Sequence, residues 1–251
     1  MAGGFGTRLA EYTDLLPKPM VEIGRKPILW HIMKIYSHFG FNDFIIALGY
    51  KSEIIKRYFL DFLKTSSDFT IDLSNGEVTI LKKTNLNWKV TLVDTGLNSM
   101  TGGRIKRLEE YIGNESFLCT YGDGVADINI CELVKFHKSN SKIATISTVR
   151  PSARFGELII DGEEVKSFKE KPRTNQGWIN GGFFVFDSDI FKYIKDDKTV
   201  LEEYPLEKLA SENQLSAFKH EGFWQCMDNV RDRNYLQDLW ENDMANWKLW
   251  D

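Results

Sequence analysis

Residues 26–50, "KPILWHIMKIYSHFGFNDFIIALGY", place a helical pattern directly before a short apolar run. Apolar residues recur at helical spacing from Ile28 onward, Pro27 suits a first helical turn, and Gly40 suits a C-terminal stop. The run "DFIIALGY" has the length and content of a buried strand. A helix followed at once by a buried strand is typical of α/β proteins.

The alternation continues on the C-terminal side of this stretch. Helices are predicted over residues 52–64, 102–113 and 128–140, and strands over 89–96, 116–124 and 142–150. Ser52 is the candidate cap of the first of these helices. Asn75-Gly76 lies between two alternating runs and predicts a hairpin. Strands that alternate with helices indicate a mostly parallel sheet covered on both faces.

After about residue 150 the pattern changes. Asp161-Gly162 joins two short predicted strands, and 178–187 is a further strand. Predicted helices at 205–213 and 230–243 enclose an extended segment. We interpret this half as an α+β extension of the same sheet. The predicted fold class is therefore α/β, a Rossmann-like mixed, mostly parallel sheet with helices on both faces, in one domain.

The composition narrows the class of protein. Hydrophobic residues make up 42% of the 251 residues, enough for a sizeable core, and the net charge of -4 argues against a mainly electrostatic grip on nucleic acid. Cys119, Cys131 and Cys226 form no CxxC pair and favour a reducing compartment. The apolar runs are too short to span a membrane. We therefore expect a cytoplasmic protein that binds neither nucleic acid nor membrane.

The first residues suggest an anion site. In "GGFGTR", Gly3, Gly4 and Gly6 allow bare backbone N–H groups to approach phosphate oxygens, and Thr7 and Arg8 add donors. The spacing matches neither GxxxxGK[ST] nor GxGxxG. Taken alone, the loop is therefore as compatible with an ordinary glycine-rich turn.

A lysine between two prolines strengthens the case. In "LPKPM", Pro17 and Pro19 are predicted to hold Lys18 in an extended segment with little conformational freedom. A proline-rich surface loop is the alternative. The loop and the lysine together, within so short a span, favour an anion site.

Several motifs together resemble one family. "GGFGTRL" followed by "PKPMVEIGRKPIL", then "TYGDGVAD", "FKEKP" and "NGGFFVFD", resemble the signature of the sugar-1-phosphate nucleotidylyltransferases, also called nucleotide-sugar pyrophosphorylases. Within that family, "VDTGLNSMTGGRIKR" and "GFWQCMDNVRDR" look most like the members that use CTP. The resemblance covers nearly the whole chain. It implies the nucleotide-diphospho-sugar transferase fold, with about 1–150 as a nucleotide-binding half and about 151–251 as a sugar-binding half.

The resemblance also implies a reaction. An oxygen of glucose 1-phosphate would attack the α-phosphorus of CTP, giving CDP-glucose and pyrophosphate. Both substrates are anionic, so catalysis would rest on positioning and on charge neutralisation, with Mg2+ as the expected cofactor. Two alternatives stay open: the same fold using UTP or dTTP, and a catalytically silent, nucleotide-sensing homologue.

Two aspartates are the implied metal ligands. Asp123 stands at a predicted strand end, where a turn aspartate before glycine is the alternative role. Asp228 is the second carboxylate by resemblance, and an N-cap of the last helix is its alternative. We interpret the nearby Asp127 as a cap only.

The remaining implied residues bind the two substrates. Arg8 and Lys18 are the catalytic cations, beside phosphate-binding Gly3, Gly4, Gly6 and Thr7. The base-recognition segment contributes Thr101, Gly102, Gly103 and Arg104, with Asp94 as a possible contributor. The sugar-phosphate site would consist of Gly156, Glu170, Lys171 and Asn180, with Trp224 nearby. A charged strand end and a core tryptophan are the alternatives for "FKEKP" and Trp224.

The two chain ends carry separate expectations. Family members begin with a short hydrophobic strand that leads into the glycine loop, whereas Met1 here lies almost at the loop. We expect the missing strand to leave unpaired backbone groups and to lower stability. At the other end, "LWENDMANWKLWD" looks like an exposed aromatic face, so we expect a homo-oligomer.

Overall fold

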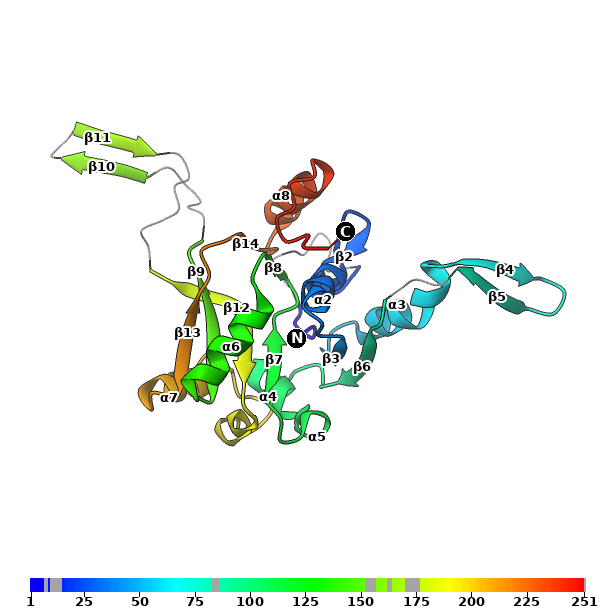
Figure 1. The fold of residues 1–251 in the computed structure, drawn as a ribbon, viewed down its shortest axis with the longest axis horizontal. Coiled ribbons are helices and arrows are strands. Elements are labelled where there is room, and N and C mark those ends of the chain that lie inside the picture. The colour runs from blue at the N-terminus through cyan, green and yellow to red at the C-terminus, as the bar shows by residue number, and fades with distance from the viewer. Residues whose placement is uncertain are drawn as a thin grey trace.

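The computed structural model describes residues 1–6, 9, 15–82, 86–151, 157–161, 164–169 and 177–250 (Figure 1). The helices are η2 (Lys18–Met20), α2 (Ile28–His38), α3 (Ser52–Thr65), α4 (Thr101–Lys106), α5 (Glu109–Ile112), α6 (Ile130–Asn140), η3 (Ser188–Tyr193), α7 (Tyr204–Ser211) and α8 (Val230–Glu241). The strands are β1 (Glu22–Ile23), β2 (Lys26–Pro27), β3 (Asp43–Leu48), β4 (Asp68–Asp72), β5 (Glu77–Lys82), β6 (Lys89–Asp94), β7 (Phe117–Thr120), β8 (Gly124–Ala126), β9 (Ala144–Val149), β10 (Glu157–Asp161), β11 (Glu164–Lys169), β12 (Ile179–Phe186), β13 (Leu215–Lys219) and β14 (Trp224–Cys226).

The central sheet is mixed, as the sequence predicts. This four-stranded sheet has the order β13-β9-β12-β7, in which β13 runs parallel to β9 while β12 is antiparallel to both of its neighbours. Strands β3 and β6 form a separate parallel pair. Two hairpins, β4–β5 and β10–β11, extend away from the body of the molecule (Figure 1).

Strand β12 shows how the sheet separates two cores. Its Phe183 and Val185 belong to the cluster that includes residues of α2, α6 and α8, whereas Phe184 and Phe186 belong to the cluster with residues of η3 and α7. Side chains alternate across a strand, so both faces of β12 are covered by helices. This confirms the predicted α/β class.

Three local predictions need correction. Lys51, in the left-handed region at φ 52°, precedes α3, and Ser52 is its first helical residue, so Ser52 is not the cap. The predicted helix over 102–113 is two short helices, α4 and α5. Lys18 opens a 3-10 turn, because the φ fixed by Pro19 suits such a turn as well as an extended segment.

The C-terminal tryptophans pack within the chain. Trp247 is completely buried, and Trp240, Trp247 and Trp250 surround His31 of α2 with ring centroids 4.7 to 6.2 Å away. Burial lowers the pKa of His31 to about 4, so this histidine is a neutral packing residue. The expectation of an exposed aromatic face was therefore wrong, and it gives no support to self-association.

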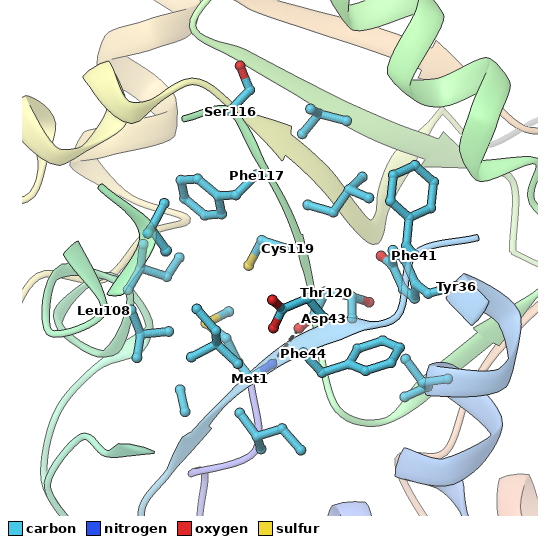
Figure 2. Close-up of a pocket in the computed structure, with 18 of the residues that line it drawn as sticks. Met1, Tyr36, Phe41, Asp43, Phe44, Leu108, Ser116, Phe117, Cys119 and Thr120 are labelled. Atoms are coloured by element: carbon cyan, nitrogen blue, oxygen red, sulfur yellow. Dashed lines mark hydrogen bonds between the residues drawn. The ribbon is translucent and has the colours of Figure 1, made fainter. Parts of the chain in front are cut away.

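A cavity of about 700 Å3 separates β3 from β7 (Figure 2). Apolar side chains from the strands, from α2 and from the α4–α5 region line most of it. The first residues of the chain reach between the two strands: Ala2 N–H donates to Ala47 O at 3.0 Å, and the Met1 ammonium donates to Thr120 O at 2.5 Å. Burial lowers the pKa of that ammonium from its ordinary value.

The fold has no helix, among the described residues, that is long and apolar enough to cross a membrane.

The cavity leads to a prediction about stability. A six-residue Val/Ile-rich segment joined ahead of Met1 would continue between β3 and β7, pair with their backbone groups and replace the buried ammonium by a peptide bond. We expect the melting temperature to rise by about 5 °C or more, which corresponds to roughly 2 kcal/mol at this size. A Gly/Ser segment of equal length is the control. Equal melting temperatures for the two extensions would contradict the prediction.

Candidate active site

Lys18 and the two predicted metal ligands meet at one point. The Lys18 ammonium donates to Asp123 Oδ2 at 2.6 Å and to Asp228 Oδ1 at 2.7 Å. These residues are separated by 105 and 210 positions in the sequence. The fold therefore brings together the cation and both carboxylates that the sequence singles out.

A short strand pair that the sequence did not predict causes this convergence. Strands β8 and β14 pair antiparallel, with Gly124 opposite Cys226. One residue beyond that pair, Met227 N–H donates to Asp123 O at 2.7 Å. The pairing places the residue after Met227, Asp228, beside Asp123.

Asp228 does not cap helix α8, so its carboxylate is available to the cluster. Asn229, one residue later, accepts the N–H of Asp232 and so caps α8. The alternative role of Asp228 as the cap is therefore wrong. Asp127 is also not a cap, since Asn129 caps α6, and Asp127 lies 3.0 Å from His220 Nε2.

The cluster is partly buried, which strengthens its electrostatics. The side chains of Lys18, Asp123 and Asp228 are 13%, 27% and 25% exposed. Burial alone would lower the pKa of Lys18, but the charge of Asp123 and hydrogen bonds to both carboxylates outweigh it, so the pKa of Lys18 is raised. Lys18 is therefore a firmly protonated cation in this state.

The cluster lies in a cleft of about 630 Å3. Gly3, Gly4 and Gly6 line it together with the cluster, so the glycine loop and the acidic pair face the same space. The segment Leu97–Thr101 forms another part of its wall. Of the residues predicted for base recognition, Thr101 and Arg104 line the cleft, and Asn98 and Ser99, which no motif singled out, line it too.

Arg104 holds the cleft wall in place. It is 4% exposed, and its guanidinium donates to the carbonyl oxygens of Gly3, Leu48, Gly96 and Leu97 and to the Thr95 hydroxyl, at 2.7 to 3.1 Å. Burial lowers its pKa, although a guanidinium stays charged. A side chain on Gly3 would overlap this guanidinium, its Cβ falling 2.4 Å from Nη1. The glycine loop and the 95–97 loop are thus tied to one buried cation.

Gly102 and Gly103 face away from the cleft. A Cβ at Gly102 would lie 2.7 Å from Thr199 O, and one at Gly103 would lie 2.4 Å from Asp197 O. Neither glycine lines the cleft. The structure therefore explains this glycine pair by close packing against residues 197–199.

A hydrogen-bonded chain crosses the side of the cleft. Asn180 Nδ2 donates to the Tyr121 hydroxyl at 3.0 Å, and Tyr121 donates to Glu202. Thr101 donates to the same carboxylate at 2.5 Å. Thr101 and Tyr121 line the cleft. No motif singled out Glu202, which lies in the connection between η3 and α7.

The remaining predicted site residues either lie outside the described residues or make contacts elsewhere. Thr7, Arg8, Gly156, Glu170 and Lys171 lie outside the described residues. Asp94 accepts the Gly96 N–H at 2.9 Å, and Trp224 donates to Gly181 O at 2.7 Å, next to Asn180.

The donor set fits a magnesium ion. Two carboxylate oxygens already converge on one cation, the Lys18 ammonium. Mg2+ is commonly held by one or two carboxylates together with substrate phosphates, so a pair is sufficient. The part of the chain that the structure describes contains no group of three or more His, Cys, Asp or Glu residues arranged for a metal.

The chain is similar to known proteins over its length. A model of the nucleotidyl transferase family matches residues 1–241. The chain is 51% identical over 252 residues to the glucose-1-phosphate cytidylyltransferase of Salmonella typhi, with 100% of this chain and 98% of that protein covered. The identity to the probable glucose-1-phosphate cytidylyltransferase of Bacillus subtilis (strain 168) is 43% over 251 residues, again covering 100% and 98%. These matches run along the whole chain.

A solved structure confirms the predicted fold. The crystal structure of HddC from Yersinia pseudotuberculosis complexed with GMP-PN matches with a TM-score of 0.69 at 26% identity, covering 95% of this chain and 96% of that chain.

The environment of Arg104 predicts a large effect on stability. Arg104→Met keeps the aliphatic stem but leaves buried carbonyl groups without donors, so the free energy of unfolding should fall by roughly 3 kcal/mol. Arg107→Met is the matched control, because Arg107 is exposed and pairs only with the exposed Asp197, and it should cost less than about 1 kcal/mol. Urea denaturation measures both. Similar small losses would contradict the role of Arg104.

Proposed function

This chain belongs to the nucleotidyl transferase family, and on that premise we propose that it transfers the cytidylyl group of CTP to glucose 1-phosphate, giving CDP-glucose and pyrophosphate. The substrates follow from the relatives that share 51% and 43% identity over the full chain. The observation that carries the chemistry is the convergence of Lys18, Asp123 and Asp228 in a cleft bordered by the glycine loop.

The reaction joins two anions, so its main demand is charge neutralisation. A phosphate monoester has a second pKa of about 6 and is largely deprotonated at neutral pH, so no dedicated base is required. Asp123 and Asp228 would hold Mg2+, which supplies Lewis-acid neutralisation of the triphosphate when it is bound. Lys18 supplies the cation of the chain itself, and its raised pKa keeps it charged.

The glycine loop is proposed to receive the phosphates. Gly4 borders open space, since a Cβ there would meet no atom of the described chain within 4 Å, and Gly6 has a φ of 64° that favours glycine. Thr7 and Arg8 follow directly and are proposed to add donors, with Arg8 on the leaving pyrophosphate. Gly156, Glu170, Lys171 and Asn180 are the proposed sugar-phosphate residues.

The proposal extends to the base and to assembly. Segment Leu97–Thr101 lies beside the phosphate site and is the proposed wall for cytosine, with Arg104 as its support.

Self-association of the chain is a further part of the proposal. The exposed Phe69, Ile71 and Leu81 of the β4–β5 hairpin offer apolar area for it, and light scattering in solution measures the mass.

The test of the proposed reaction compares nucleotides. Each of CTP, UTP, dTTP and GTP is incubated with glucose 1-phosphate and Mg2+, and pyrophosphate release is followed. We expect kcat/KM to be at least about 100-fold higher for CTP, because a pocket that hydrogen-bonds the cytosine amino group rejects a carbonyl in its place. A preference for UTP or dTTP would overturn the cytidylyl assignment, and absence of turnover with every nucleotide would support a silent homologue.

Substitutions at the acidic cluster test the site. Asp123→Asn should lower kcat by about 100-fold or more at saturating Mg2+, because it removes a ligand charge without removing volume. Lys18→Ala should also lower kcat far more than the melting temperature. Asp127→Asn is the matched control, since Asp127 pairs with His220 away from the cluster, and should keep near-normal turnover. Unchanged kcat in Asp123→Asn would remove Asp123 from the mechanism.

A further inference from the structure

Residues 197–202 approach the cleft wall because two glycines allow it. Gly103 N–H donates to Thr199 O at 3.2 Å, and Met100 N–H donates to Asp197 O at 2.8 Å. With Cβ atoms at Gly102 and Gly103, this segment could not come so close. Two residues after Thr199, Leu201 is fully buried, and its N–H donates to the Thr101 hydroxyl at 2.9 Å. The glycine pair therefore seats the segment that presents Glu202 to the cleft.

The hydrogen bonds around Glu202 have only one possible direction. Gly182 N–H can only donate, and it donates to Asn180 Oδ1 at 2.7 Å, so the amide nitrogen of Asn180 faces Tyr121. The Tyr121 oxygen accepts from that nitrogen and must give its own proton to Glu202 Oε1.

The second carboxylate oxygen completes the arrangement. Thr101 accepts from Leu201 N–H and gives its proton to Glu202 Oε2. Both oxygens of Glu202 are therefore acceptors, one for each cleft-lining hydroxyl.

We propose that Glu202 is a positioning residue for the sugar-phosphate side of the reaction: it orients the Tyr121 hydroxyl at the cleft wall and, through that hydroxyl, the Asn180 amide. The inference rests on the proposed function, because Asn180 is the proposed sugar-phosphate residue. Charge-assisted bonds such as Tyr121 to Glu202 are stronger than neutral ones and fix geometry. Asn180 keeps one amide N–H and one carbonyl lone pair beyond those used by Tyr121 and Gly182, and these fit sugar hydroxyls.

The test uses a graded series at Glu202. Glu202→Leu removes both acceptors, and KM for glucose 1-phosphate should rise about tenfold. KM for CTP should change less than about threefold, because the Leu201 N–H still holds the Thr101 hydroxyl in place. Glu202→Gln keeps one oxygen for Tyr121 and turns its amide to Thr101, whose oxygen has a free lone pair. It should therefore restore KM for glucose 1-phosphate to within about threefold of the wild type. Tyr121→Phe should reproduce Glu202→Leu, and the double variant should be no worse than either single one.

Glu203→Leu is the matched control, since Glu203 is adjacent and exposed, and its kinetics should equal those of the wild type. Equal kinetics for Glu202→Leu and Glu203→Leu would overturn the inference. So would equal rises of both KM values that Glu202→Gln does not restore, since that pattern indicates a structural role. If Glu202→Leu does not fold, an unchanged KM for glucose 1-phosphate in Tyr121→Phe overturns the inference in the same way.

Wild-type turnover separates this inference from the proposed function. A wild type that releases no pyrophosphate from CTP and glucose 1-phosphate overturns the function and, with it, the role of Glu202. A wild type that is active while Glu202→Leu behaves like Glu203→Leu overturns the role of Glu202 alone.

Discussion

The antiparallel pairing of β8 with β14 is the interaction on which the site depends. It is only three residues long, yet it joins the turn after β7 to the segment before α8. Asp123 and Asp228 are far apart in the sequence, and this pairing brings them together in space. Without it, Lys18 would lack one of its two carboxylate acceptors. Two carboxylates held close together repel each other, so their proximity requires both the strand pair and a cation between them.

Hydrogen-bonded charged side chains have the equivalent role on the other side of the cleft. Arg104 donates hydrogen bonds to carbonyl oxygens of two loops. Glu202 accepts hydrogen bonds from the hydroxyls of Thr101, at the start of α4, and Tyr121, just after β7. Such groups are costly to bury without partners, so their complete pairing fixes one arrangement of the surrounding loops. The cleft thus takes its shape from a few charged side chains in the walls, and the helices and strands supply the frame.

Much of the frame could be predicted from the sequence, because it depends on local periodicity. The helix over 28–38 and the hairpin at Asn75-Gly76 follow from spacing and turn chemistry alone. The short pair β8–β14 could not be predicted, since three-residue strands carry too little pattern. The resemblance to a family selected Asp228, and the structure then gave the reason for its proximity to Asp123.

Gly102 and Gly103 show what a sequence motif cannot predict. "TGGR" suggested a nucleotide loop, and the structure instead packs Gly102 and Gly103 against the backbone of 197–199. A glycine that admits a ligand and a glycine that admits another segment look the same in a sequence, because both simply lack a side chain. Arg104 was assigned through the resemblance of its segment, and the structure adds five hydrogen bonds to neighbouring loops that the motif does not reveal.

The position of Met1 has a practical consequence for handling the protein. Its backbone nitrogen points between β3 and β7 and is buried against Thr120 O, whereas the last described residues follow α8 and pack on α2 (Figure 1). A purification tag joined directly ahead of Met1 would therefore run beside β3 and β7. An affinity handle at the opposite terminus avoids that path and leaves the sheet undisturbed.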